Sequence, residues 1–148
     1  MPKRLFFQAD SNNDVSIRLW KDSSYEVGND GINLDAVITY LDASVDFSAK
    51  IDTGAAYSIF ERSIGERLGL NIEKGIRQRF GTATGIFYAF GFRVLLSTAG
   101  FDFDSMVFFA ADESYSKNVL GRIGWLDQVV LGLVDYEGTL YLSKYSES

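Results

Sequence analysis

The sequence has 148 residues, of which 47% are hydrophobic and 15% aromatic, and this length and composition suit one domain with a single core. It contains neither cysteine nor histidine, which excludes disulfides, serine–histidine and cysteine–histidine triads, most zinc hydrolase sites and thiol redox chemistry. The formal charge of −6 argues against nucleic acid or an anionic membrane as a partner, because phosphate binding depends on lysine and arginine.

The first thirty residues, 1–30, are predicted to form an N-terminal extension. Apolar and polar residues alternate over 15–20, as in a strand, between the turn-prone clusters 11–14 and 22–24. This pattern indicates a hairpin. The basic start resembles a signal peptide, but Gln8 and Asp10 interrupt the apolar segment that follows. Elsewhere no apolar run reaches the ~18 residues of a membrane span, so we expect a soluble, cytoplasmic protein.

The main domain is predicted to span residues 31–148 and to open with two strands. Residues 34–40 alternate, a turn follows at 41–44, and a second strand runs into Asp52. Apolar side chains share one face of the second strand, so period-2 geometry places Asp52 on the opposite face. We therefore expect Asp52 to leave the strand as a displayed carboxylate.

A short helix is predicted just after the Asp52 turn. Ser58 and Glu61 have the S-x-x-E spacing of a capping box. Ile64 and Leu68 are one helical turn apart, and Gly69 can end the helix. These features indicate that the chain after Asp52 is anchored by helical structure.

The rest of the domain reads as strands and turns. Glycines at 81, 85 and 91 punctuate a hairpin-like segment, and strands are then predicted at 92–97 and 101–110 around a turn at 98–100. The remaining predicted elements, in chain order, are a strand ending at 119–121, one or two helical turns at 123–128, and strands at 129–134 and 139–143 around a turn at 135–138. The sum is a mostly β domain with two short helices.

One triplet in this pattern, Asp52-Thr53-Gly54, suggests a site. Alone it is a weak signal, since most such triplets are ordinary turns. Here it follows an apolar strand, and the segment 49–55 with Ser58 downstream resembles the active-site loop of retropepsin-like aspartic peptidases. The later segment 118–122, Asn-Val-Leu-Gly-Arg, resembles the apolar-apolar-Gly-Arg element of the same family. Both elements together favour the site over a plain turn.

The resemblance implies a half-barrel that carries a flap hairpin over the active site. The flap tip would consist of residues at the predicted hairpin turn, namely Gly81, Thr82, Ala83, Thr84 and Gly85. A phosphate-binding loop is the rival interpretation of these glycines, but the lysine and the strand-to-helix setting of such loops are missing.

The resemblance also implies that Asp52 is catalytic and pairs with Asp52 of a second chain. Thr53, Gly54 and Ala55 would support that carboxylate from its own loop. The second supporting loop would consist of Leu120, Gly121 and Arg122. Only one such triplet is present, so a homodimer would complete the site, whereas a two-lobed pepsin-like enzyme needs roughly twice this length. No cofactor and no metal are implied.

Two positions depart from the family pattern. Viral members carry an acidic residue four positions after the catalytic aspartate as the partner of the arginine, whereas this chain has Ala56. Arg122 then needs another partner, such as Asp127 or a helix carboxylate. Lys50 occupies a usually apolar position on the strand face of Asp52, where a cation would favour the ionised carboxylate or select substrates.

Two functions are compatible with these residues. The first is an aspartic endopeptidase that binds an extended peptide or protein segment and cleaves one internal bond. The second is a catalytically silent retropepsin-like module that only dimerises or binds peptides. Among other candidates, Asp102 and Asp104 indicate a solvated sheet face rather than a metal site, and Trp125 is predicted to lie in the core.

Overall fold

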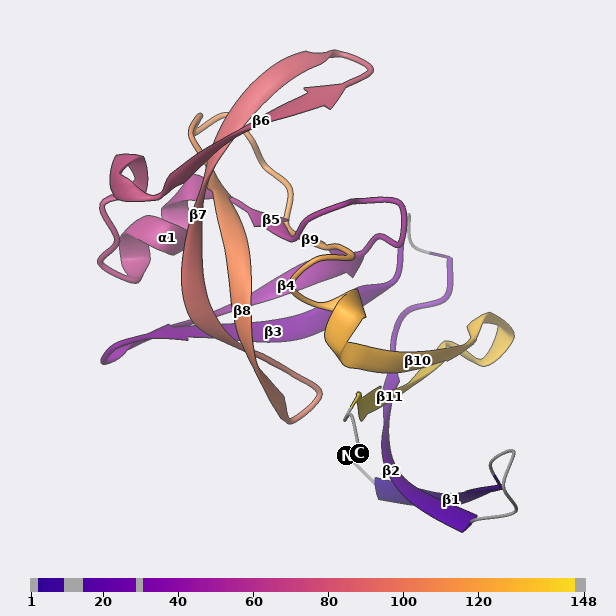
Figure 1. Cartoon of the computed structure of the whole chain (residues 1–148). Helices are drawn as coiled ribbons and strands as arrows, with labels where there is room; N and C mark the ends of the chain where they lie inside the picture. The colour runs from indigo at the N-terminus through magenta and orange to yellow at the C-terminus, as the bar shows by residue number, and fades with distance from the viewer. Residues whose placement is uncertain (1–2, 10–14, 29–30, 146–148) are drawn as a thin grey trace.

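The computed structural model describes residues 3–9, 15–28 and 31–145, and the predicted turn at 11–14 lies outside these ranges. The described residues form strands arranged in two sheets (Figure 1). Strand pairing is almost entirely antiparallel, apart from short parallel pairings of β4 with β9 and of β5 with β8. The mostly β architecture predicted from the sequence is therefore confirmed.

The larger sheet has seven strands in the order β3-β4-β9-β5-β8-β7-β6. Its strands, in chain order, are β3 (Asn33–Tyr40), β4 (Ala43–Ile51), β5 (Ile59–Phe60), β6 (Ile76–Thr82), β7 (Gly85–Thr98), β8 (Phe101–Ala110) and β9 (Val119–Leu120). A further pairing of β3 with β7 joins the two ends of this order, leaving β6 outside. The sheet thus closes into a small barrel from which β6 and the start of β7 project as a hairpin.

The hydrophobic core fills this barrel. Its largest fully buried side chains include Phe60, Phe103, Phe109 and Trp125. Burial of each such side chain contributes about 1.5–3 kcal/mol to folding. The Trp125 Nε1–H donates to the Thr98 hydroxyl over 3.0 Å, which satisfies its polar atom inside the core. The prediction that Trp125 is a core residue is confirmed.

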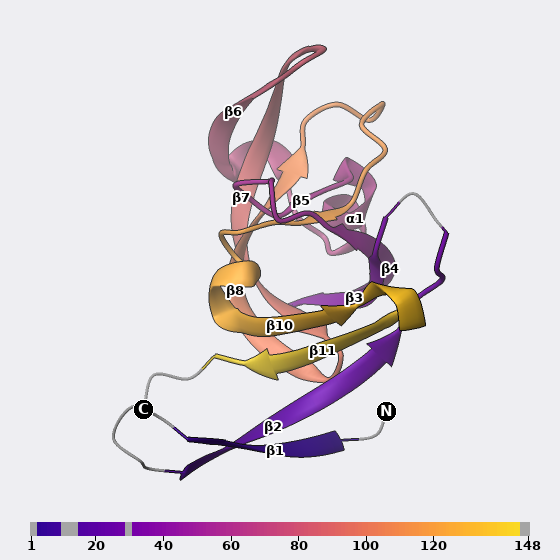
Figure 2. The ribbon, with the colours of Figure 1, turned by 90° about the vertical axis from the view of Figure 1, so that its right-hand side faces the viewer.

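The smaller sheet joins the two ends of the chain in the order β1-β2-β11-β10. Its strands are β1 (Lys3–Ala9), β2 (Val15–Ser24), β10 (Val129–Val134) and β11 (Thr139–Lys144). In Figure 2, β10 and β11 face the viewer and β2 crosses below them. Leu140 and Leu142 of β11 are fully buried and connect this sheet to the core.

The predicted turn at 22–24 is wrong, because these residues continue β2 and pair with β11. Cross-strand hydrogen bonds with a partner far along the chain override the local turn preference of Asp22 and the two serines. The division into an extension of residues 1–30 and a domain of residues 31–148 remains a prediction, although β2 shares its sheet with the C-terminal strands.

The helix after the Asp52 loop is α1 (Arg62–Arg67). It begins at Glu61 without a side-chain cap, so the predicted capping box is wrong: Ser58 is buried and bonds to another loop. Gly69 follows the helix with a φ of +83°, as predicted for a helix stop. The second predicted helix is the 3₁₀ turn η2 (Leu126–Gln128).

Of two further 3₁₀ turns, η1 (Ile72–Lys74) was not predicted, whereas η3 (Asp135–Glu137) lies at the predicted turn 135–138. No helix in the described ranges is long and apolar enough to span a lipid bilayer.

The β6–β7 hairpin points away from the β1–β2 hairpin, and the two occupy opposite ends of the molecule (Figure 1). The residues that position a site are therefore those of the barrel and its projecting hairpin.

Candidate active site

Asp52 lies where β4 ends, and the backbone of this strand end is bonded to the segment 118–120, which contains β9. Its N–H donates to the Leu120 carbonyl over 3.0 Å, and the Lys50 N–H donates to the Asn118 carbonyl over 2.8 Å. Residues on the apolar face of β4 are buried or half-buried, whereas Asp52 is exposed. The prediction of a displayed carboxylate at a strand end is confirmed.

The loop itself orients this carboxylate. The Gly54 N–H donates to Asp52 Oδ1 over 2.9 Å, and the Ala55 N–H donates to the Asp52 carbonyl over 3.2 Å. A Cβ at Gly54 would lie 3.3 Å from Oδ1, so a larger residue would crowd the oxygen that this N–H holds. Hydrogen bonds to a carboxylate are stronger than neutral ones. One oxygen of Asp52 is thus held by the loop, and the residue as a whole is exposed.

A second loop crosses the Asp52 loop at close range. The Arg122 N–H donates to the Ala55 carbonyl over 2.9 Å, and the Ile123 N–H donates to the Ala56 carbonyl over 2.8 Å. The predicted pairing of the Asp52 loop with the segment around Gly121 therefore exists in the fold.

Gly121 is required at this crossing because of the neighbouring backbone. An added Cβ would lie 2.6 Å from the Tyr57 carbonyl carbon and closer still to its oxygen. The Gly121 N–H donates to the hydroxyl of Ser58 over 3.0 Å, and both residues are buried. Ser58 is therefore a support for the loop crossing, a role that its predicted place in a capping box concealed.

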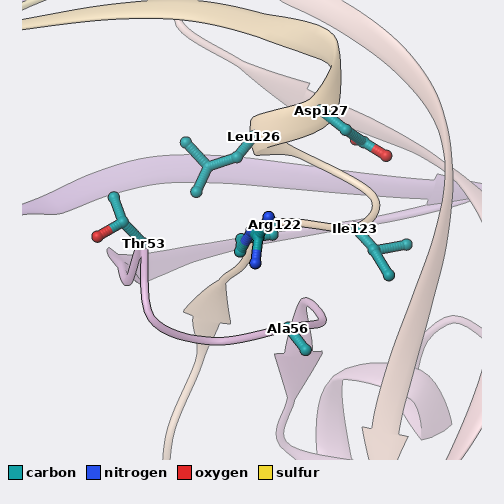
Figure 3. Close-up of a pocket in the computed structure, with 6 residues that line it drawn as sticks. All are labelled: Thr53, Ala56, Arg122, Ile123, Leu126 and Asp127. Carbon is teal, nitrogen blue, oxygen red and sulfur yellow. The ribbon is translucent and has the colours of Figure 1, made fainter.

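Arg122 makes no ion pair within the described ranges of the chain. Asp127 instead accepts the Gly124 N–H over 3.2 Å, and its carboxylate points away from Arg122 in Figure 3. The helix carboxylates are also engaged, since Glu61 bonds Asn118 and Glu66 bonds Arg62. Both partners suggested for Arg122 are therefore wrong, and its side chain is exposed.

Arg122 lines a cavity of about 510 Å³ beside the Asp52 loop (Figure 3). Its other lining residues are Thr53, Ala56, Ile123, Leu126 and Asp127. Within the described ranges the Thr53 hydroxyl has no hydrogen-bond partner and the residue is exposed. Thr53 and Arg122 thus lie together on an open face next to the site.

Lys50 does not pair with Asp52 in the described part of the chain, although alternation placed both on one face. Its aliphatic stem covers Gly31, where an added Cβ would lie 2.9 Å from Lys50 Cδ. Gly31 belongs to the segment that leads into β3, so the lysine side chain extends toward that strand. The expectation that Lys50 acts on the Asp52 carboxylate remains a prediction.

The β6–β7 hairpin forms the opposite wall of a second cavity, of about 420 Å³, that contains Asp52. Of the predicted tip residues, Gly81 and Thr82 line this cavity, and Ala83, Thr84 and Gly85 do not. The tip is exposed throughout and is closed by the Thr82 hydroxyl, which donates to the Gly85 carbonyl over 3.0 Å. The fold thus places a projecting hairpin across from the carboxylate.

Aromatic side chains connect this hairpin to the Asp52 loop. Phe80 and Phe87 stack with ring centroids 5.2 Å apart, and Phe87 stacks on Tyr115 at the same 5.2 Å. Tyr57 meets Phe80 edge to face at 5.6 Å. Burial, with a smaller contribution from the charge of Glu61, raises the pKa of the Tyr115 phenol, which keeps it a neutral hydrogen-bond donor.

Sequence reasoning did not identify Tyr57, Tyr115 and Lys117, which line this cavity. Tyr115 and Lys117 lie in the polar segment between β8 and β9, which has no periodic pattern. Only the fold brings this segment to the Asp52 cavity, so no local signal marked it.

The acidic residues of β8, Asp102 and Asp104, contact neighbouring side chains. The Ser97 hydroxyl donates to Asp102 over 2.6 Å, and Arg93 lies 3.4 Å from Asp104. Both aspartates are exposed, which confirms the predicted solvated face of β8. In the described ranges no group of three acidic residues is arranged to hold a metal ion.

Comparison with known proteins places this geometry in a family. The family model described as aspartyl protease matches residues 37–133, which include both crossing loops and the β6–β7 hairpin. No curated protein matches the sequence.

Two solved structures resemble the fold. A retropepsin-like aspartic protease from Rickettsia conorii is 12% identical, with a TM-score of 0.55, and the match covers 97% of this chain and 91% of that one. The EIAV protease complexed with the inhibitor HBY-793 is 18% identical, with a TM-score of 0.52, over 68% of this chain and 88% of that one.

Proposed function

Since this chain belongs to the aspartyl protease family, we propose that it is an aspartic endopeptidase in which two Asp52 carboxylates of a homodimer activate a water molecule. The observation that carries this proposal is the Asp52 loop. The loop presents an exposed carboxylate, and the Gly54 N–H holds one of its oxygens. The Asp52 N–H bonds to Leu120 of β9, and the Ala55 carbonyl accepts the Arg122 N–H. A carboxylate fixed in this way is suited to proton transfer rather than to structural pairing.

Two adjacent carboxylates cannot both ionise easily, so the pair shares one proton. The ionised carboxylate takes a proton from the water as the water oxygen attacks the peptide carbonyl carbon. The protonated carboxylate donates to the carbonyl oxygen, which gives a tetrahedral intermediate. The carbon–nitrogen bond then breaks as the leaving nitrogen takes a proton from the pair. No covalent enzyme intermediate forms.

The homodimer is supported first by the incomplete site. The sequence contains one Asp-Thr-Gly triplet, so a single chain supplies one carboxylate of the pair. The exposed Thr53 hydroxyl and the exposed Arg122 lie beside it, on the face shown in Figure 3. Polar groups of this kind are available to the corresponding loop of a second chain related by a two-fold axis.

An uncovered strand edge gives a second argument for the homodimer. β10 lies at the edge of the smaller sheet and pairs only with β11 among the described strands. Its Leu133 and Val134 are 44% and 38% exposed, and the strand has neither lysine nor proline to block pairing. β10 directly follows η2, whose Leu126 lines the same cavity as Thr53. We propose that β10 of each chain pairs with its counterpart.

We further propose that the β6–β7 hairpin is a flap over the substrate. An extended peptide would lie between the hairpin and the two carboxylates as an added strand. Gly81 and Thr82 line the cavity that contains Asp52, so closure of the tip would cover a bound peptide.

The decisive test compares the wild-type protein with the Asp52→Asn variant. Cleavage of a broad peptide library is measured by mass spectrometry, and assembly by sedimentation velocity. The wild type should dimerise and cleave, and its turnover should disappear on dilution below the dimer dissociation constant. Asp52→Asn preserves shape but removes the shared proton, so this variant should dimerise without cleaving.

Mixed dimers of one wild-type chain and one Asp52→Asn chain separate a shared pair from two independent sites, because only a shared pair predicts that the mixed dimer is inactive. A protein that cleaves as a monomer at every concentration would contradict the mechanism. A protein that dimerises but never cleaves at any pH would instead be a peptide-binding or dimerisation module.

A further inference from the structure

The cavity beside Asp52 has, among the described residues, one charged lining residue besides that carboxylate. Its walls are formed mainly by aromatic and small residues of the hairpin, the Asp52 loop and the segment before β9. Lys117 of that segment is the exception. In a chain with a formal charge of −6, a cation at the mouth of the proposed substrate cavity is a distinctive feature.

The backbone on either side of Lys117 is well anchored. The Asn118 side chain accepts the Glu61 N–H and donates to the Glu61 carboxylate, both over 2.9 Å. Two residues before Lys117, Tyr115 stacks on Phe87. The neighbours of Lys117 therefore hold its backbone at the cavity, which the Lys117 side chain lines.

Lys117 also lacks a counter-ion among the described residues. Its side chain is exposed, and the ion pairs of the described ranges do not include it. An ammonium group that the protein leaves unpaired beside an apolar cavity can pair with a carboxylate of a bound ligand. Such a pair at an exposed rim selects between ligands rather than providing most of the affinity.

The apolar part of the cavity defines the neighbouring ligand group. Phe80, Phe87 and Tyr57 form a connected aromatic wall, and Ile59 adds an aliphatic surface. A volume of about 420 Å³ accommodates a large apolar side chain. In an extended peptide, side chains two residues apart point to the same face. A peptide that places an apolar side chain in this cavity would therefore direct the side chain two positions away along the same wall of the cavity.

We propose that this site selects peptide segments with a large apolar residue and, two positions away, an acidic residue whose carboxylate pairs with Lys117. The inference rests on the proposed protease function and names its substrate class. It makes Lys117 a specificity residue with no part in the chemical step.

The test uses the dimeric protein and matched peptides. Each peptide carries phenylalanine, with Glu, Gln or Lys two positions before or after it, and kcat/KM is compared within each set. Wild type should prefer Glu over Gln by about fivefold, mainly through KM, as expected for an exposed ion pair. Lys117→Gln should abolish this preference, and Lys117→Glu should reverse it in favour of Lys peptides.

Lys74→Glu is the matched control, because Lys74 is an exposed lysine of η1 that does not line the cavity. It changes the net charge by the same amount and should retain the wild-type preference. If Lys74→Glu reverses the preference as Lys117→Glu does, overall charge is responsible and the inference is overturned.

Binding to the Asp52→Asn dimer, measured by fluorescence anisotropy of labelled peptides, separates this inference from the protease function. Cleavage without any Glu preference overturns the role of Lys117 and leaves the protease. Glu-selective binding without wild-type cleavage overturns the protease and supports Lys117. Neither binding nor cleavage of any peptide overturns both.

Discussion

The loop crossing around Asp52 and the tip of the β6–β7 hairpin face the same cavity but are built in opposite ways. The crossing joins two backbones through short hydrogen bonds, and Gly121 leaves no space for a side chain. At the tip, Gly81 and Gly85 have no atom within 4 Å of an added Cβ. The Asp52 loop is thus held by close backbone contacts, whereas open space surrounds these two positions of the hairpin tip.

Under the proposed function, this contrast would allow one small domain to hold a catalytic carboxylate in place and still admit a substrate. A carboxylate that transfers protons must keep its geometry, so its support comes from the barrel itself. Under the proposed function the hairpin would open for a substrate, and below its tip it is held by the contacts of Phe80 with Tyr57 and of Phe87 with Tyr115.

The largest expected difference between the two regions is in amide exchange. Amides of residues 81–85 should exchange at least ~1000-fold faster than those of residues 45–51, because the tip is exposed and β4 is paired along its length. Hydrogen exchange with mass spectrometry measures both segments in one sample. A bound peptide should slow exchange at the tip, and equal protection of the two segments without peptide would refute a mobile tip.

Alanine substitution at two glycines tests the contrast in packing. Gly121→Ala should lower the free energy of unfolding by about 3 kcal/mol, because the new methyl group meets the Tyr57 carbonyl. Gly81→Ala is the control and should change it by less than about 0.5 kcal/mol, since the methyl group enters open space. Urea denaturation gives both values, and similar losses would show that the crossing is not tightly packed.

Removal of a hydroxyl group gives a smaller effect of the same kind. Ser58→Ala should cost about 1–2 kcal/mol, because the buried Gly121 N–H loses its acceptor. Thr84→Ala removes a hydroxyl from the exposed tip and should be nearly neutral. Thermal and urea unfolding of the two variants provide the comparison, and a neutral Ser58→Ala would mean that water replaces the hydroxyl.

The smallest effect concerns the ion pair outside both regions, where Arg62 contacts Glu73 at 2.6 Å and donates to the Ala111 carbonyl over 3.0 Å. The hydrogen bond from Arg62 lowers the pKa of Glu73 below its ordinary value of 4.5. A depressed carboxyl pKa contributes stability above the unfolded value, and this contribution is lost as the pH falls through the folded value.

Glu73→Gln should therefore slightly lower the unfolding midpoint at neutral pH, and its difference from wild type should vanish on the acid side of pH 4.5. Glu113→Gln, at an exposed carboxylate outside this contact, is the control. A Glu73→Gln difference that persists unchanged in acid would show that the pair does not depend on ionisation.

Local pattern and motif were sufficient to predict much of the site. Alternation along β4 placed Asp52 on the exposed face, because strand side chains point to opposite faces whatever the strand pairs with. The triplet Asp52-Thr53-Gly54 and the later Gly121-Arg122 indicated two loops that meet, and the hydrogen bonds from Arg122 and Ile123 join them. Gly69 likewise ended α1 through its own backbone freedom.

Only the tertiary structure decided the contacts between segments that are far apart in the sequence. The Ser58 hydroxyl meets Gly121 instead of capping a helix, because a buried N–H across the crossing needs an acceptor more than a solvated helix end does. Asp22 joins β11 rather than a turn, and Lys117 reaches the Asp52 cavity from a segment without pattern. Periodicity records which face of a strand is buried, whereas these partners depend on how the barrel closes, which no short segment encodes.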